Sequence, residues 1–191
     1  MMVKIKNNSP MRFMILTLIL LMVYLIVSIP FKVMEIIPGF TDIRPVAMLH
    51  PVYGIFFGIA GCIACAVGNL ITDMVGDSLR WSSIAGFIAN FVGPLLFCIY
   101  WRKLSHKSFH LRNMKNILTQ MMVIVVVAVA EALMITLAVA LVYPDVDYWL
   151  FFFSVILNTS AFPIFLGIPL IIVLQEEVGL KIKLPSGNKA E

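Results

Sequence analysis

The sequence predicts an all-α membrane protein, a compact bundle of six transmembrane helices with both termini in the cytoplasm. Of its 191 residues, 61% are hydrophobic and only 13% are charged, whereas charged residues make up about a quarter of a typical soluble domain. A helix needs roughly 20 mostly apolar residues to span a bilayer. Apolar runs follow one another along the chain with short polar connections, and the length has room for about six spans.

The first half of the chain contains three of the expected spans. A polar, basic segment, residues 1–10, precedes the first span at residues 11–31, and a loop with turn-forming residues follows at 32–44. Residues 45–75 are too many for one crossing and few for two. We therefore expect two short helices here, broken near residues 58–61, with the first helix partly re-entrant.

The second half contains the other three spans. In order, we expect a polar turn at residues 76–80, a fourth span at 81–101, a basic loop at 102–115, a fifth span at 116–143, an acidic turn at 144–147 and a sixth span at 148–174. The membrane domain then covers residues 11–175. The polar tail, residues 176–191, is expected to lie in the cytoplasm and to be disordered at its end.

The distribution of charge sets the expected orientation. Most of the 14 Lys and Arg residues lie in the N-terminal segment, the loop after the fourth span and the tail, so the positive-inside rule places these three parts in the cytoplasm. The opposite side receives the acidic residues Glu35, Asp42, Asp77, Asp145 and Asp147. Because the basic residues occupy short connections between spans, the net charge of +4 indicates orientation and not a nucleic-acid partner.

Small residues recur at helical spacing in the second and third spans. They are Gly54, Gly58, Ala60, Gly61, Ala64, Cys65 and Gly68. Small side chains at this spacing let two helix backbones approach closely, which is a main route to helix association in membranes. The run predicts close packing inside the bundle, docking against a partner membrane protein, or both.

The cysteines do not indicate a metal or redox site. Cys62 and Cys65 form a C-x-x-C, but the motif lies in an apolar helix with no second cysteine or histidine pair nearby in sequence. We therefore expect no metal and no cofactor, and assign Cys65 to helix packing.

Three asparagines at membrane depth are the first candidate binding residues. Asn69, Asn90 and Asn158 lie in the third, fourth and sixth spans. Amide side chains at this depth either hydrogen-bond between helices or converge on one cavity in a compact bundle. Asp73 lies four residues beyond Asn69 on the same helix face, and Asp77 one turn further. Both carboxylates are expected near the external interface.

Glu131 is the most costly residue to place in a bilayer. It lies near the middle of the fifth span, between apolar runs, where an ionised carboxylate is unfavourable. Three roles are open: a protonated structural residue bonded to another helix, a binding group for a polar or cationic ligand, and a proton-coupling group. Arg44 and His50, at the outer end of the second span, are expected to close the mouth of a pocket; Arg44 could instead be an interfacial anchor.

The sequence lacks the common motifs of hydrolytic enzymes. It contains no G-x-x-x-x-G-K-[ST], no H-E-x-x-H and no G-x-S-x-G. We therefore expect no ATP hydrolysis by a P-loop of this chain, so energy for transport has to come from an ion gradient or from a partner.

Three stretches resemble the S components of energy-coupling factor (ECF) transporters, which are small six-helix proteins that capture vitamins and related micronutrients. The stretches are P-V-x-G-I-F-F-G-I-A-G-x-I-A-x-A-V-G-N-L-I-x-D at residues 51–73, G-F-I-A-N-F at residues 86–91, and L-N-T followed by small residues and proline at residues 157–169. The resemblance covers most of residues 37–174. It implies a substrate-binding subunit whose pocket opens outward beneath the loop between the first two helices.

The resemblance also implies partners and a location. S components associate with a membrane scaffold protein and a pair of cytoplasmic ATPases in the bacterial cytoplasmic membrane. Their usual docking feature is A-x-x-x-A in the first helix, but residues 11–31 contain no alanine. Ala60 and Ala64 have the right spacing in a different helix, which leaves the docking surface open.

The expected ligand is a small polar micronutrient. Arg44, His50, Asn69, Asn90, Glu131 and Asn158 are the candidate residues for binding it in an otherwise apolar pocket. An anionic or amide-rich ligand would favour Arg44, and a cationic ligand Glu131. Two alternatives remain: a proton- or ion-coupled carrier or channel with Glu131 as the titrating group, and an intramembrane enzyme or assembly subunit that uses Asp73 and Asp77.

Overall fold

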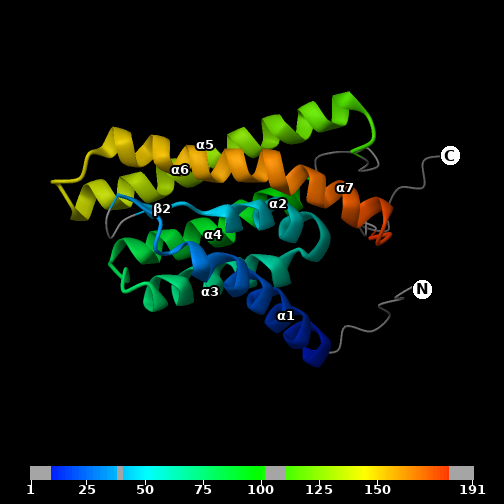
Figure 1. Cartoon of the computed structure of the whole chain (residues 1–191), viewed down its shortest axis with the longest axis horizontal. Helices are drawn as coiled ribbons and strands as arrows, with labels where there is room; N and C mark the ends of the chain where they lie inside the picture. Colours follow the sequence, from blue (N-terminus) through cyan, green and yellow to red (C-terminus); the bar gives the residue numbers. More distant parts are fainter. Residues whose placement is uncertain (1–9, 38–40, 102–110, 181–191) are drawn as a thin grey trace.

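The computed structural model describes residues 10–37, 41–101 and 111–180, and these form the expected all-α bundle (Figure 1). Within the described residues, four helical segments are long and apolar enough to cross a membrane, namely Pro10–Phe31, Ser82–Ile99, Met114–Val142 and Tyr148–Glu176. Two shorter apolar helical segments, Pro45–Phe57 and Ile59–Val75, supply the remaining two of the six. The prediction of a six-helix polytopic membrane protein is confirmed.

The first helix, α1 (Pro10–Ser28), begins one residue earlier than expected and continues into a short 3₁₀ turn, η1 (Ile29–Phe31). Its N-terminal half leans away from the rest of the bundle (Figure 1). Most of its apolar side chains, including Met14, Leu18 and Met22, are exposed. In a bilayer this surface faces lipid or another membrane protein.

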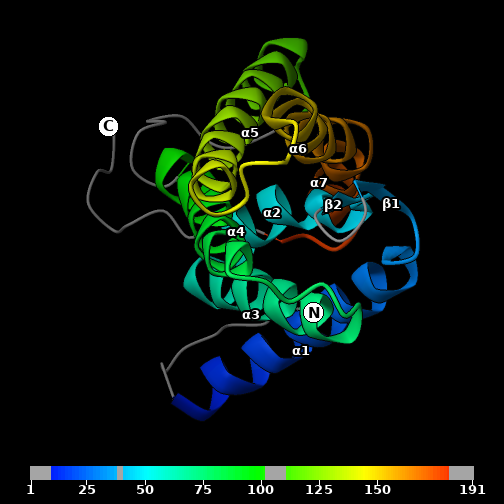
Figure 2. The same ribbon diagram turned by 90° about the vertical axis from the view of Figure 1, so that its left-hand side faces the viewer.

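The connection after α1 contains a small hairpin that the sequence did not predict. Strands β1 (Glu35–Ile37) and β2 (Thr41–Asp42) pair antiparallel, with Glu35 opposite Asp42. From β2 the chain then turns into the bundle (Figure 2).

The next segment forms the centre of the bundle and turns back at Gly58. It consists of η2 (Pro45–Met48), α2 (Leu49–Val52) and a π-helical turn, η3 (Tyr53–Phe57). At about 1.5 Å per residue, this segment is too short to cross a hydrocarbon core of about 30 Å as a helix. Gly58 has φ 61° and ψ −129°, a conformation open mainly to glycine, and α3 (Ile59–Val75) then runs back. The expected break is confirmed.

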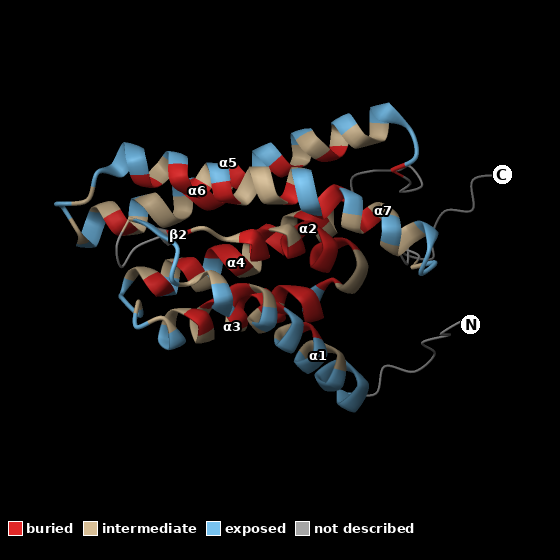
Figure 3. Ribbon diagram, viewed as in Figure 1, coloured by how far each residue is buried: buried red, intermediate tan, exposed pale blue. Residues whose placement is uncertain are grey.

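Three long segments complete the bundle. Helix α4 (Ser82–Ile99) packs against α3 and α5 (Met114–Val142), and α5 packs against α6 (Tyr148–Phe162). After α6 the chain continues through a π-helical turn, η5 (Pro163–Gly167), into α7 (Ile168–Glu176), so the sixth span is one helical rod. Buried residues concentrate on α2, α3 and α4, and the outer helices carry the exposed ones (Figure 3).

The small residues of the second and third spans pack inside this chain. Gly54, Gly58, Ala60, Gly61, Ala64, Cys65 and Gly68 are all buried. A Cβ at Gly54 would overlap the backbone oxygen of Pro94 in α4, and one at Gly68 would overlap the ring of Tyr24 in α1. This arrangement supports the packing interpretation. Docking of a partner through these buried residues is not supported.

The start of α1, the end of α7 and the start of α5 lie at one end of the bundle, and the hairpin and the turn after α5 lie at the other (Figure 1). This is the grouping expected for six spans. Which end faces the cytoplasm stays a prediction. The N-terminal segment up to residue 9, residues 102–110 of the basic loop and the tail from residue 181 lie outside the described residues.

Candidate functional site

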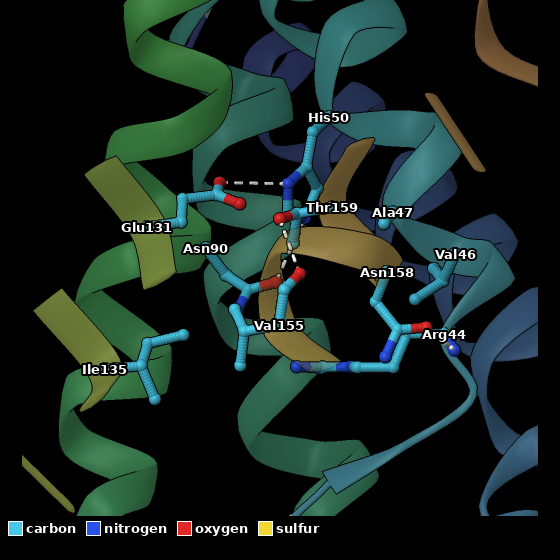
Figure 4. Close-up of a pocket in the computed structure, with 10 residues that line it drawn as sticks. All are labelled: Arg44, Val46, Ala47, His50, Asn90, Glu131, Ile135, Val155, Asn158 and Thr159. Carbon is cyan, nitrogen blue, oxygen red and sulfur yellow. Dashed lines mark hydrogen bonds and ion pairs between the residues drawn. The ribbon is translucent and has the colours of Figure 1, made fainter. Parts of the chain in front are cut away.

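A cavity near the middle of the bundle collects most of the candidate residues (Figure 4). We call it the inner cavity. Its walls come from the Arg44–His50 segment and from helices α4, α5 and α6. Its polar lining residues are Arg44, His50, Asn90, Glu131, Asn158 and Thr159. Apolar residues, among them Ile135 and Val155, complete it, which is the usual composition of a small-molecule site.

His50 and Glu131 form a buried pair at this cavity. The Nδ1 of His50 lies 3.1 Å from Oε1 of Glu131, and the two side chains are 5% and 3% exposed. His50 was expected at the mouth of the pocket; this is wrong, because η2 and α2 carry the chain inward and place the imidazole against α4 and α5. The structure therefore gives Glu131 a specific partner 81 residues away in sequence.

Asn90 fixes the orientation of the imidazole. Its Nδ2 donates to the carbonyl of Gly86 at 2.8 Å, so its Oδ1 is the atom that faces Nε2 of His50 at 3.0 Å. Because Oδ1 can only accept, Nε2 carries a hydrogen and donates it. The hydroxyl of Tyr24 in α1 donates to the same oxygen at 3.2 Å. The Asn90 side chain of α4 thus links α1 and α2 to α4 by hydrogen bonds from Tyr24 and His50.

The hydrogen on Nε2 constrains the His50–Glu131 pair. A second hydrogen must lie between Nδ1 and Oε1, since a bare nitrogen lone pair facing a carboxylate oxygen would be repulsive. That hydrogen belongs either to Glu131, with a neutral imidazole, or to an imidazolium beside a carboxylate. The pair has no net charge in either arrangement, and this lowers the cost of burying Glu131 at membrane depth.

One carboxyl oxygen of Glu131 is available to accept a hydrogen bond from a ligand. Among the described residues, the structure gives one hydrogen bond at its Oε1, with His50, and none to its Oε2. The carboxyl group belongs to the cavity lining, so Oε2 can accept from a donor on a ligand.

Asn158 holds the hairpin against α6. Its Nδ2 donates to the backbone oxygen of Asp42, and its Oδ1 accepts from the backbone N–H of Arg44, both at 3.0 Å. Asn158 therefore lines the inner cavity while fixing the segment that covers it.

Asn69 lies in a neighbouring compartment, so of the two alternatives for the three asparagines, the structure does not bring all three into one cavity. Asn90 and Asn158 line the inner cavity, whereas Asn69 lines a more polar space together with Lys32 and Asp73. The Oδ1 of Asn69 accepts from the guanidinium of Arg44. The separation arises because Arg44 extends between the two spaces.

Asp73 was expected to be an interfacial carboxylate in water. It is instead 15% exposed and accepts a hydrogen bond from Nζ of Lys32 at 3.0 Å. Lys32 also lies 3.4 Å from Asp42 in the hairpin. These ion pairs connect the end of α1, the hairpin and α3.

Three residues of the site were not predicted from the sequence: Tyr24, Lys32 and Asp42. Tyr24 was the one aromatic residue with a polar tip in the first span, which is the signal that could have identified it. Lys32 and Asp42 resemble ordinary charges at the end of a span, and only the hairpin brings them to Asp73 and Arg44.

Gly93 provides the space for the Glu131 carboxylate, and this gives a first prediction. A Cβ at Gly93 would overlap Oε1 of Glu131 and would lie 2.7 Å from its Cδ. Because the carboxylate ends a flexible side chain, Gly93→Ala is expected to rotate it away from His50. We expect ligand affinity to fall about tenfold or more, the effect of losing a charge-assisted hydrogen bond. Isothermal titration with the ligand measures this change. Ile88→Ala, at an exposed position of the same helix, is the control.

If the affinity of Gly93→Ala equals that of the Ile88→Ala control, the carboxylate position has no part in binding.

Metal binding finds no support in the part of the chain that the structure describes. No group of three His, Cys, Asp or Glu side chains there has the geometry to hold a metal ion. Cys62 and Cys65 are both buried within α3.

Comparison with known proteins identifies a family. A family model described as QueT transporter matches residues 14–176, which is most of the chain. No curated protein and no solved structure matches.

Proposed function

The chain belongs to the QueT transporter family, which confirms the resemblance to S components of ECF transporters, and we propose that it is the substrate-binding subunit of an ECF-type importer. Members of this family are S components for queuosine precursors. We infer that this chain takes such a precursor from the external side.

The inner cavity supports a guanine-like ligand. Queuosine is a modified guanosine, so its precursors carry a base with adjacent N–H donors and a carbonyl acceptor along one edge. A carboxylate can accept from two such N–H groups. The unbonded Oε2 of Glu131, held at the cavity by His50, is the observation that carries this proposal. Asn90 and Asn158 would act mainly by fixing the walls, since their amides already bond to the protein.

The energy for uptake would come from partner proteins. The sequence has no P-loop motif, and we propose that it catalyses no ATP hydrolysis. A membrane scaffold protein and a pair of cytoplasmic ATPases would complete the importer in the bacterial cytoplasmic membrane. The scaffold would meet exposed apolar surface, as on α1, because the small residues of α2 and α3 are covered within this chain.

A proton-coupled carrier is the second candidate. The observation that favours it is the His50–Glu131 pair, which shares a hydrogen at membrane depth. Such a carrier would move its substrate without partners and would stop when the proton gradient is collapsed.

Mass spectrometry of small molecules retained through purification tests the proposed ligand. We expect the protein to retain a guanine-like compound, and added guanine or a queuosine precursor to displace it. A retained compound of different chemistry, together with no saturable binding of guanine-like bases, would contradict the proposal.

A further inference from the structure

Two cavities meet at the side chain of Arg44. The inner cavity has an open volume of about 20 Å³, and the neighbouring space about 50 Å³. We call the second space the outer compartment; its charged lining residues are Lys32, Asp42, Arg44 and Asp73. Arg44, Ile135 and Val155 line both spaces. An open volume of about 20 Å³ holds roughly one water molecule, so no base fits the inner cavity until a side chain moves.

Arg44 is the residue whose movement would join the two spaces. Its backbone is fixed, because its N–H donates to Asn158. Its guanidinium reaches across the boundary to Asn69 and to Asp42, where Nε lies 3.6 Å from Oδ1. Ile135 and Val155 are short side chains on long helices, whereas Arg44 has a flexible stem that can rotate while the backbone stays in place.

Moving Arg44 would change the balance of charge in the outer compartment. Lys32 and Arg44 together offset Asp42 and Asp73. Without the guanidinium, Asp42 keeps Lys32 alone and Asn69 loses the donor to its Oδ1. The vacated space would then keep two carboxylates and one cation, Lys32, so a hydrogen-bond donor on the ligand would be favourable there.

We propose that Arg44 divides a single ligand site, and that the outer compartment takes a substituent of the ligand that donates hydrogen bonds to Asp42 and Asp73. This inference rests on the proposed function, which places the base in the inner cavity. Binding displaces the guanidinium, the base enters beside Glu131, and the donor on the substituent replaces the donors that Arg44 withdraws. Asp42 and Asp73 thereby select among ligands with the same base.

Matched probes test the outer compartment. Guanine, 7-(2-hydroxyethyl)guanine and 7-propylguanine share a base, and the two arms have equal size but only one ends in a donor. We expect the hydroxyethyl compound to bind the purified full chain about tenfold more tightly than the propyl compound, the effect of one good hydrogen bond to a carboxylate. Asp73→Asn is expected to reduce this ratio below about threefold. Asp77→Asn, which changes an exposed carboxylate one turn away, is the control and is expected to leave the tenfold ratio of affinities unchanged.

The outcomes separate the inference from the proposed function. Three outcomes, each with guanine itself bound, would overturn the inference alone. The hydroxyethyl and propyl compounds could bind with equal affinity, Asp73→Asn could leave the ratio of their affinities unchanged, or neither compound could bind. If guanine itself does not bind, the proposed function fails and the inference fails with it. Size-exclusion profiles establish that each variant is folded.

Arg44→Ala tests the dividing role directly. The natural protein must break the contacts of Arg44 with Asn69 and Asp42 before a base enters, and that cost lowers its apparent affinity. We expect Arg44→Ala to bind guanine about threefold or more tightly than the natural protein. Unchanged or weaker binding of guanine would overturn the proposal that Arg44 divides the site. If this variant does not fold, the affinities of the hydroxyethyl and propyl compounds for the natural protein test the proposal instead.

Discussion

Replacing Glu131 by glutamine is expected to leave the protein folded and to lower its ligand affinity about tenfold to a hundredfold, or about 1.4–2.8 kcal/mol. The fold survives because a glutamine amide can donate to Nδ1 of His50, whose Nε2 hydrogen is already committed to Asn90. Binding weakens because the amide oxygen that then faces the cavity is uncharged, and a neutral acceptor makes a weaker hydrogen bond to a ligand N–H than a carboxylate oxygen does.

Isothermal titration with guanine or a queuosine precursor measures this difference. Glu177→Gln, which makes the same chemical change at an exposed position, is the control and is expected to bind as the natural protein does. Equal affinities for Glu131→Gln and the control would remove Glu131 from the proposed binding role.

Gly54→Ala is expected to produce the largest loss of stability. A Cβ there would overlap the backbone oxygen of Pro94 and would lie 3.0 Å from Cβ of Phe97. Neither neighbour is the free end of a flexible side chain, so η3 and α4 must separate. We expect a loss of about 3 kcal/mol, because overpacking a close contact costs that order of free energy, and a midpoint of thermal unfolding in detergent lower by about 5–10 °C.

Gly76→Ala is the matched control for this measurement. Its Cβ would meet only the flexible stem of Lys32, at 3.0 Å, and Gly76 has a negative φ of −84° that alanine adopts freely. A midpoint for Gly54→Ala that equals that of Gly76→Ala would show that α4 does not pack closely on η3.

The fold was largely predictable because a bilayer constrains a sequence more than water does. Apolar length identified the four long spans, and residues 45–75 were too short for two full crossings, which predicted the break now seen at Gly58. The hairpin between α1 and η2 was not predicted. Its strands have three and two residues, too few for a recognisable alternation of apolar and polar side chains.

The candidate site was only partly predictable. Glu131 and Asn90 were identified by their cost at membrane depth, a property that each residue carries alone. The partners were not predictable, because His50 meets Glu131 only once η2 has carried the chain inward. The division between the two cavities depends on the direction of one arginine side chain, which sequence spacing does not specify.

The most direct test of a substrate-binding subunit compares binding and uptake by the purified protein alone in liposomes. We expect saturable binding of a radiolabelled queuosine precursor that approaches one ligand per chain, with no accumulation in the lumen whether or not a proton gradient is imposed. Repeated turnover that fills the liposomes in the absence of a scaffold protein and ATPases would contradict this account and would favour the proton-coupled carrier.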